Sequence, residues 1–402
     1  MKVTVVGGGL AGLAAAIDLV DSGHAVTVLE ARPTLGGAVQ TLPEREGDPS
    51  PPPDNGQHIA LGCFTEYLRF LERIGEGGSY RRLSLELPVI AEDGRVATLG
   101  RSGSSFLRYR HLSFGERLHV ANAVRRLPAS GPKTQTFGAL LRELGCSNAS
   151  IDRFWDVFVR PALNLRTDEV SAEWGVFTVR TALLADRGAS DVILPTRPLG
   201  WMHGDAAGRA LEAAGAAVET GARVESLDDV DADAVVVAAP PGEAARLLGE
   251  PDPELEDSPI VSIHLLFDRP LLRHPLAALL GSDSHWVFDR GTLTGRLPEG
   301  GGQYLTVVSS GVPELMDIRG RELVERIAGQ LVERLGRAEL LWSRVSREPQ
   351  ATLALRPGVV RPPLRTGRAN VVRAGAWTDT GWPATMEGAV RSGLAAAGEV
   401  RT

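Results

Sequence analysis

The stretch KVTVVGGGLAGLAAAIDLVDSGHAVTVLE, Lys2 to Glu30, decides the fold. It contains an apolar β-branched run, a glycine turn, an alanine-rich helical pattern, a second turn at Ser22-Gly23 and a second strand pattern that ends in Glu30. Two strand patterns separated by a helical pattern are typical of a βαβ unit with parallel strands. We therefore predict an α/β fold built on a parallel sheet.

The glycines of this turn indicate a dinucleotide site. Gly7, Gly9 and Gly12 match the spacing G-x-G-x-x-G, and we expect Leu10 and Ala11, which lie between them, at the same site. The first glycine permits a tight turn, the second lets the backbone approach a pyrophosphate, and the third allows close packing of helix on strand. Glu30 ends the second strand, where a carboxylate can accept both ribose hydroxyls. The pattern predicts a Rossmann-like domain.

The residues that follow Glu30 distinguish between dinucleotides. Ala31, Arg32, Gly36 and Gly37 belong to the stretch ARPTLGG, which resembles FAD-dependent amine oxidases and carotenoid-type desaturases. In those families the arginine and the double glycine run past the phosphates of the cofactor. The resemblance favours FAD over NAD.

Composition limits the class of protein. The chain has 402 residues, 43% of them hydrophobic, and no apolar run long enough to span a bilayer. Two cysteines and a strand that begins by Val3 favour a cytoplasmic protein without a signal peptide. A net charge of −7 argues against nucleic-acid binding. The eight histidines show neither metal-ligand spacing nor a Ser-His-Asp order, so no metal site is predicted.

Two later stretches are expected to complete the nucleotide domain. Residues 204 to 241 have the pattern helix, strand, turn and apolar strand. In the resembling flavoproteins a strand residue at the place of Val224 contacts the adenine, and the turn that contains Ala239 closes over the nucleotide. The domain is therefore expected to be discontinuous, with FAD-binding parts at 1–75, 201–260 and 366–402 and an α+β substrate domain at 76–200 and 261–365.

The C-terminal stretch AGAWTDTGWPATMEGAVRSG, Ala374 to Gly393, is expected at the flavin end of the site. Pro383 or Thr385 would begin a helix with an apolar face. Its free amides suit a pyrophosphate or a ring oxygen. We expect Asp379 near the ribityl-pyrophosphate and the backbone amides of Met386 and Glu387 near the isoalloxazine. Gly375 and Ala384 are also expected to contact the cofactor.

A third motif narrows the resemblance. Asp54-Asn55-Gly56-Gln57-His58, together with residues 154–172 and the closing tryptophan motif, resembles the bacterial squalene-associated FAD-dependent desaturases, understood as hydroxysqualene dehydroxylases. The resemblance covers essentially the whole chain and implies reductive removal of the hydroxyl of hydroxysqualene, giving squalene. One residue departs from the pattern: the family usually has an acid that contacts the ribityl chain where this chain has Ala376.

Loss of a hydroxyl needs a proton donor in a dry pocket, where burial can move its pKa toward neutrality. His58 and Asp54 are the first candidates, because their loop passes near the flavin in the resembling proteins. Gln57 could orient the hydroxyl, Gly56 is expected to contact the cofactor, and Asn164 is a weaker candidate. Aromatic side chains expected around a cationic intermediate are Phe154, Trp155, Phe158, Trp174, Phe177, Trp286 and Phe288.

An isoprenoid lipid substrate implies peripheral contact with a membrane, at the inner face of the plasma membrane. Six arginines and one glutamate lie among apolar residues between Arg101 and Arg126, as in an interfacial element or, equally, a solvated helix. A single dinucleotide fingerprint implies a separate electron donor. The alternatives are an oxidative desaturase, an amine oxidase, which the presence of only Lys2 and Lys133 disfavours, and a non-catalytic lipid carrier.

Overall fold

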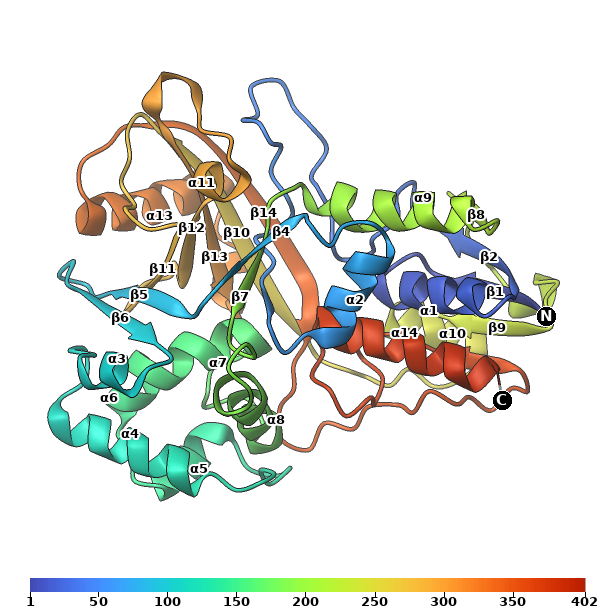
Figure 1. The fold of residues 1–402 in the computed structure, drawn as a ribbon, viewed down its shortest axis with the longest axis horizontal. Helices are drawn as coiled ribbons and strands as arrows, with labels where there is room; N and C mark the ends of the chain where they lie inside the picture. The colour runs from blue at the N-terminus through green and yellow to red at the C-terminus, as the bar shows by residue number, and fades with distance from the viewer. Residues whose placement is uncertain (402) are drawn as a thin grey trace.

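The computed structural model describes residues 1–401, whose strands form three sheets (Figure 1). The nucleotide sheet has the order β15-β9-β1-β2-β8, and every neighbouring pair is parallel. Its strands are β1 (Lys2–Val6), β2 (Ala25–Glu30), β8 (Ala217–Thr220), β9 (Ala234–Val237) and β15 (Val371–Arg373). The N-terminal βαβ unit is confirmed, and the strands come from three distant parts of the chain.

Two helices from opposite ends of the chain pack together beside this sheet. Helix α1 (Leu10–Asp21) and helix α14 (Met386–Val400) run side by side in Figure 1. A Cβ atom on Gly393 would lie 2.1 Å from the carbonyl oxygen of Ala11, so only glycine permits this close approach. The other helices of this part are α2 (Thr65–Arg73), α9 (Ala206–Ala213) and α10 (Pro241–Leu248). The start of the nucleotide domain is thereby fixed against its C-terminal helix.

The second sheet has the order β14-β10-β13-β12-β11-β5-β6. The pair β11 and β5 is parallel and the remaining pairs are antiparallel. Its strands are β5 (Glu86–Ile90), β6 (Val96–Gly100), β10 (Asp257–Phe267), β11 (Leu276–Leu279), β12 (Trp286–Asp289), β13 (Gln303–Ser310) and β14 (Leu340–Leu353). The alternating patterns of IVSIHLLFD, HWVFDRG and YLTVVSS predict β10, β12 and β13, which the structure confirms, but no pattern predicted the long edge strand β14. Strand β10 begins at Asp257, before the predicted boundary at 261.

The two faces of the second sheet have different neighbours. Alternate residues of β10, among them Ile263 and Leu265, form a core with the apolar side of α13 (Gly320–Leu335). The intervening residues Ser262 and His264 point to the opposite face, because successive side chains of a strand alternate. There they meet the loop of residues 54–57, where the His264 ring is hydrogen-bonded to the carbonyl of Asp54. The sheet therefore holds that loop against the nucleotide part.

A group of helices lies beside the second sheet in Figure 1. It contains α3 (Gly103–Leu107), α4 (Phe114–Arg126), α5 (Phe137–Glu143), α6 (Asn148–Ser150), α7 (Asp156–Leu163) and α8 (Ala172–Thr178). π-Helical turns cover Ile151–Trp155, Val179–Leu184 and Trp201–Asp205, and the short helices α11 (Arg290–Thr294) and α12 (Pro313–Met316) follow strands of the second sheet. The sequence patterns FGERLHVANAVRRL and FGALLRELG predict helices over 114–127 and 137–145, and α4 and α5 confirm them.

A small antiparallel sheet of β3 (Ala60–Leu61), β7 (Val192–Pro195) and β4 (Tyr80–Leu83) connects these parts. The Pro-rich stretch DPSPPPD, residues 48–54, predicts a solvent-exposed loop, but in the structure it packs on the second sheet. Its Asp48 forms an ion pair of 2.5 Å with the buried Arg344. Within residues 1–401, no helix combines the length and the apolar character needed to cross a membrane.

Candidate active site

One cavity of about 1070 Å³ runs from the nucleotide sheet to the second sheet. The predicted cofactor residues that line it are Gly7, Gly9, Leu10, Ala11, Glu30, Ala31, Arg32, Gly36, Gly37, Val224, Ala239, Gly375, Ala384, Thr385 and Met386. These residues come from three separated segments of the chain. The fold thus brings together the positions that the sequence predicted for one ligand.

The turn between β1 and α1 forms the first wall. Gly9 is the N-cap of α1, and no side chain caps the helix, so its first amides are left to face the cavity. A Cβ on Gly12 would lie 1.9 Å from the carbonyl oxygen of Gly7, which confirms its role in close packing rather than in ligand contact. Uncapped amides and the positive end of the helix dipole suit a pyrophosphate.

Two backbone amides fix the side chain of Glu30 at the end of β2. Its carboxylate accepts hydrogen bonds from the amide of Gly8 at 2.6 Å and from the amide of Arg32 at 2.7 Å. A carboxylate has about four lone-pair sites, so it retains acceptor capacity for two hydroxyls. The double-glycine loop lies directly opposite: Gly37 has a φ of 61°, and a Cβ there would approach Gly9 Cα to 2.8 Å. A narrow backbone cradle results.

The middle segment closes the nucleotide end. Val224 lies in the loop after β8 rather than on a strand, because β8 already ends at Thr220. Its carbonyl accepts a hydrogen bond of 3.1 Å from Arg246, which fixes the loop beside the cavity. Ala239 follows β9, and its carbonyl accepts a hydrogen bond of 3.2 Å from the indole N–H of Trp377. Middle and C-terminal segments are thereby tied together.

The C-terminal segment forms the other end of the cavity wall. Thr385 is the N-cap of α14 and accepts a hydrogen bond from the amide of Gly388, as its position predicted. The side-chain carboxylate of Glu387 lies at the start of α2, where the amides of Glu66 and Tyr67 donate to it at 3.2 and 2.8 Å. The glutamate side chain therefore connects two helices.

The structure corrects the expected position of the Asp379 side chain. It does not line the cavity: its side chain is 63% exposed and lies 3.6 Å from the guanidinium of Arg361. The neighbouring Ala376 does line the cavity, and no acid stands there. The direction of the Asp379 side chain could not be predicted from its spacing, because the segment between β15 and α14 is irregular.

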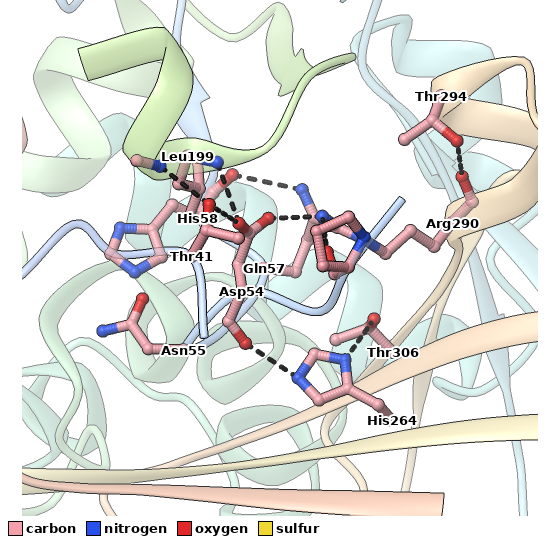
Figure 2. A network of polar contacts seen from close by, with 12 residues as sticks. Thr41, Asp54, Asn55, Gln57, His58, Leu199, His264, Arg290, Thr294 and Thr306 are labelled. Carbon is pink, nitrogen blue, oxygen red and sulfur yellow. Dashed lines mark hydrogen bonds and ion pairs between the residues drawn. The ribbon is translucent and has the colours of Figure 1, made fainter. Parts of the chain in front are cut away.

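The structure also corrects the expected position of the Asp54 side chain. Its side chain is fully buried in an ion pair of 2.5 Å with Arg290, and it does not line the cavity (Figure 2). The hydroxyl of Thr41 and the amide of Leu199 also donate to its carboxylate, each at 2.8 Å. Gly56 is likewise outside the cavity wall and instead packs on Ser262, to whose hydroxyl a Cβ would approach within 2.9 Å. Both residues hold the loop in place.

The remaining candidates of this loop do reach the cavity. Gln57 and His58 line it, and the Gln57 amide oxygen accepts a hydrogen bond of 3.4 Å from Arg290. Burial lowers the pKa of His58, and the negative charge of Asp54 opposes this shift in part. The ring is therefore neutral at pH 7, which makes it a hydrogen-bonding group rather than a ready acid.

The side chain of Asn164, a further candidate, is hydrogen-bonded to the backbone of other segments. It has a left-handed backbone, with a φ of 53°. Its side-chain amide donates to the carbonyls of Ser258 and Pro259 at 2.8 and 3.2 Å, and its oxygen accepts from the amide of Gly311 at 2.7 Å. The side chain thus joins α7 to the second sheet.

The cavity also contains a carboxyl group that no sequence motif marks. Glu348 lies on the edge strand β14, lines the cavity and is partly buried. Burial raises the pKa of Glu348, while hydrogen bonds from Asn55 and Ser346 and the charge of Arg32 act in the opposite direction. Glu348 belongs to no motif, and the polar residues around it in SREPQ gave no signal that it would reach a cavity.

Aromatic and apolar side chains line the part of the cavity remote from the glycines. Of the seven predicted aromatic residues, the four that line it are Phe158, Phe177, Trp286 and Phe288, and the unpredicted ones are Phe64 and Trp382. Phe177 and Trp382 meet edge to face with ring centroids 5.0 Å apart. Trp174 instead stacks under the guanidinium of Arg361. An apolar, aromatic chamber next to a nucleotide cradle suits a hydrocarbon beside a flavin.

Comparisons with known proteins agree with this geometry. The profile of the family described as flavin containing amine oxidoreductase matches residues 10–401. The hydroxysqualene dehydroxylases of Rhodopseudomonas palustris and Sinorhizobium fredii are each 29% identical to this chain, over 98% of its length and 97% of theirs. The zeta-carotene desaturase of Zea mays is 25% identical over 98% of this chain and 82% of its own length.

A solved structure gives the same fold. An oxidoreductase from Methanosarcina mazei superposes with a TM-score of 0.75 at 20% identity, covering 98% of this chain and 99% of that one. The uncapped amides of α1, the Glu30 carboxylate and the glycine cradle fit the diphosphate and ribose of FAD. This chain is therefore an FAD-dependent oxidoreductase, and it belongs to the family of flavin-containing amine oxidoreductases.

Proposed function

We propose that this enzyme removes the hydroxyl group of hydroxysqualene reductively and releases squalene. The observation that carries the proposal is a cavity that combines an FAD cradle with a part lined by aromatic side chains, and whose lining includes His58 and Glu348. The two relatives that bear the name hydroxysqualene dehydroxylase support it, because they match along nearly the whole chain. The proposal concerns the substrate and the direction of electron flow.

The reaction breaks one C–O bond and forms one C–H bond. A proton delivered to the hydroxyl oxygen lets it leave as water, and the carbon that remains is a cation. When bound, reduced FAD supplies the hydride that this carbon needs. The chain keeps water away and surrounds the cation with the faces of Phe158, Phe177, Trp286 and Phe288, which attract positive charge.

We assign the proton to Glu348 and the positioning of the hydroxyl to His58. The raised pKa of Glu348 keeps its carboxyl protonated at a higher pH than that of an exposed glutamate, so a proton is available for delivery. The neutral His58 ring has one donor and one acceptor nitrogen and can hold the hydroxyl oxygen. Gln57, fixed through Arg290, lies next to it in the loop.

Product analysis tests the function. The purified holoenzyme is incubated without oxygen with a chemical reductant, free flavin and detergent-dispersed hydroxysqualene, and the extracted lipids are separated by gas chromatography. We expect squalene in the wild type, much less in Glu348→Gln and His58→Ala, and full FAD content in all three. Unchanged hydroxysqualene with a fully reduced wild-type enzyme would contradict the proposal.

A carotenoid-type desaturase is the second candidate, favoured by the match to the Zea mays enzyme. Such an enzyme would have the same cofactor cradle and aromatic chamber, but electrons would pass from the substrate to the flavin. Bleaching of the oxidised enzyme by squalene or phytoene would favour this candidate. The amine oxidase alternative loses support because neither lysine lines the cavity; Lys2 pairs with Asp231 and Lys133 with Glu173.

The electron donor is expected to be a separate molecule. The chain has one glycine fingerprint, at residues 7–12, and it joins the cavity that we assign to FAD. Reduction of the enzyme by free reduced flavin or by an added flavin reductase, but not by NADH or NADPH alone, is the expected result.

A further inference from the structure

A second, smaller cavity adjoins the main one. It has a volume of about 280 Å³ and lies among α3, α4 and the π-helical turns of the helical group. Leu85, Phe158, Val179, Leu183 and Ser190 line both cavities. These shared side chains therefore lie between the main cavity and the second cavity.

Aromatic rings continue from this wall toward the surface. Phe154 contacts Phe158 with ring centroids 5.7 Å apart, and Phe106 of α3 contacts Phe154 at 5.4 Å. Phe106, Phe154 and Phe158 all line the second cavity, together with Val120 and Val124 of α4. An apolar path therefore leads from the chamber to the α3–α4 surface, and its outer residues, Arg101 to Gly103 and Leu184, are exposed.

Helices α3 and α4, which both contribute residues to the lining of the second cavity, expose large apolar side chains. Leu107 is 62% exposed, Phe114 64% and Leu118 53%. Phe114 and Leu118 are one turn apart on α4 and so lie on the same side of the helix. Large apolar side chains gathered on one exposed face mark a binding surface rather than an ordinary solvated helix.

The same surface is strongly basic. Arg101, Arg108, Arg110, Arg125 and Arg126 are exposed, and within residues 1–401 none of them forms an ion pair with an acidic side chain. The one acid of this stretch, Glu116, is used in the capping box of α4 with Ser113. Unpaired arginines beside exposed apolar groups complement an anionic lipid surface.

We propose that the α3–α4 surface docks on an anionic bilayer and that the second cavity is the passage through which an apolar chain enters the main cavity. The identity of the chain as an isoprenoid rests on the proposed function. Docking and passage rest on the exposed side chains, the unpaired arginines and the shared wall. Small movements of Leu183 and Phe158 would join the two cavities, since both side chains belong to both linings.

Vesicle binding tests the docking surface. Holoenzyme is sedimented with vesicles of phosphatidylcholine that contain about 30% phosphatidylglycerol, and with vesicles of phosphatidylcholine alone. We expect binding to the anionic vesicles only, reduced by roughly tenfold or more in Phe114→Ser/Leu118→Ser, because apolar side chains and basic residues act together at an interface. Leu297→Ser, at a site that is 74% exposed and outside the surface, is the matched control and should bind as the wild type does.

Uptake of diphenylhexatriene, a fluorescent hydrocarbon, tests the passage without any turnover. Transfer from anionic vesicles to the holoenzyme should slow severalfold in Val124→Phe, which narrows the second cavity, and stay at least as fast in Val124→Ala.

Equal binding of the Phe114→Ser/Leu118→Ser variant overturns the docking surface, and equal uptake by Val124→Phe overturns the passage. If both expected results appear while no squalene forms, the proposed function fails and the entry route stands. Binding that requires an added protein instead of anionic lipid would also overturn the proposal.

Discussion

Replacing Arg290 with leucine leaves a carboxylate without its cation in the interior of the protein. The side chains of Arg290 and Asp54 are 2% and 0% exposed, and the pair is 2.5 Å apart. Removing one partner of such a pair costs about 3–5 kcal/mol, because the remaining charge stays buried and uncompensated. Thr41 and Leu199 still donate to Asp54, so we expect a value near the lower end, about 3 kcal/mol.

The assay is urea unfolding at one fixed, saturating concentration of FAD, since a bound cofactor shifts apparent stability by mass action. The set contains Arg290→Leu, Asp54→Asn and the double variant. Because both single changes disrupt the same contact, the double variant should lose much less than the sum of the two, with a coupling free energy of about 2–3 kcal/mol. Arg321→Leu, which breaks an ion pair whose side chains are 91% and 65% exposed, is the control and should cost under about 0.5 kcal/mol.

The reasoning would be refuted by a stability of Arg290→Leu within about 0.5 kcal/mol of the wild type, or by strictly additive single effects. A functional readout separates positioning from stability alone. Arg290 also donates to the Gln57 amide, so its loss should lower turnover at temperatures where the variant is fully folded.

Three further predictions concern cofactor and chemistry. Glu30→Ala should weaken FAD binding by about 1.5–3 kcal/mol for each lost charge-assisted hydrogen bond, measured by fluorescence titration beside the exposed-site control Glu46→Ala. Ala376→Asp should tighten FAD binding in the same titration if the missing acid matters, and an unchanged affinity shows that it does not. Activity should fall as pH rises through the raised pKa of Glu348, because the carboxyl then loses the proton it delivers, and a pH–rate profile of Glu348→Gln should lack that alkaline limb. An unchanged limb in the variant would assign it to another group.

The nucleotide end of the site could be predicted because its signal is local. Gly7, Gly9 and Glu30 lie within one βαβ unit, whose geometry follows from neighbouring residues. The C-terminal helix was predictable for the same reason, since Thr385 begins an apolar helical pattern. For these elements the pattern determines both the structure and the face that lines the cavity.

The catalytic end could not be predicted to the same extent, because its contacts are distant in sequence. Asp54 was assigned to chemistry, yet its partner Arg290 lies 236 residues away and turns it from the cavity. Glu348 was overlooked because the alternation of β14 does not tell which face will meet the cavity. A loop motif places the backbone, but the direction of each side chain depends on the sheet packed against it.

The most direct test of the account is an anaerobic single turnover. The flavin of the purified holoenzyme is photoreduced, hydroxysqualene is added in detergent, and the flavin absorbance is followed while the lipid is extracted. The account predicts that the absorbance of oxidised flavin returns as squalene forms in equal amount. A flavin that stays reduced in the presence of hydroxysqualene, while the oxidised enzyme is bleached by squalene or phytoene, would contradict it.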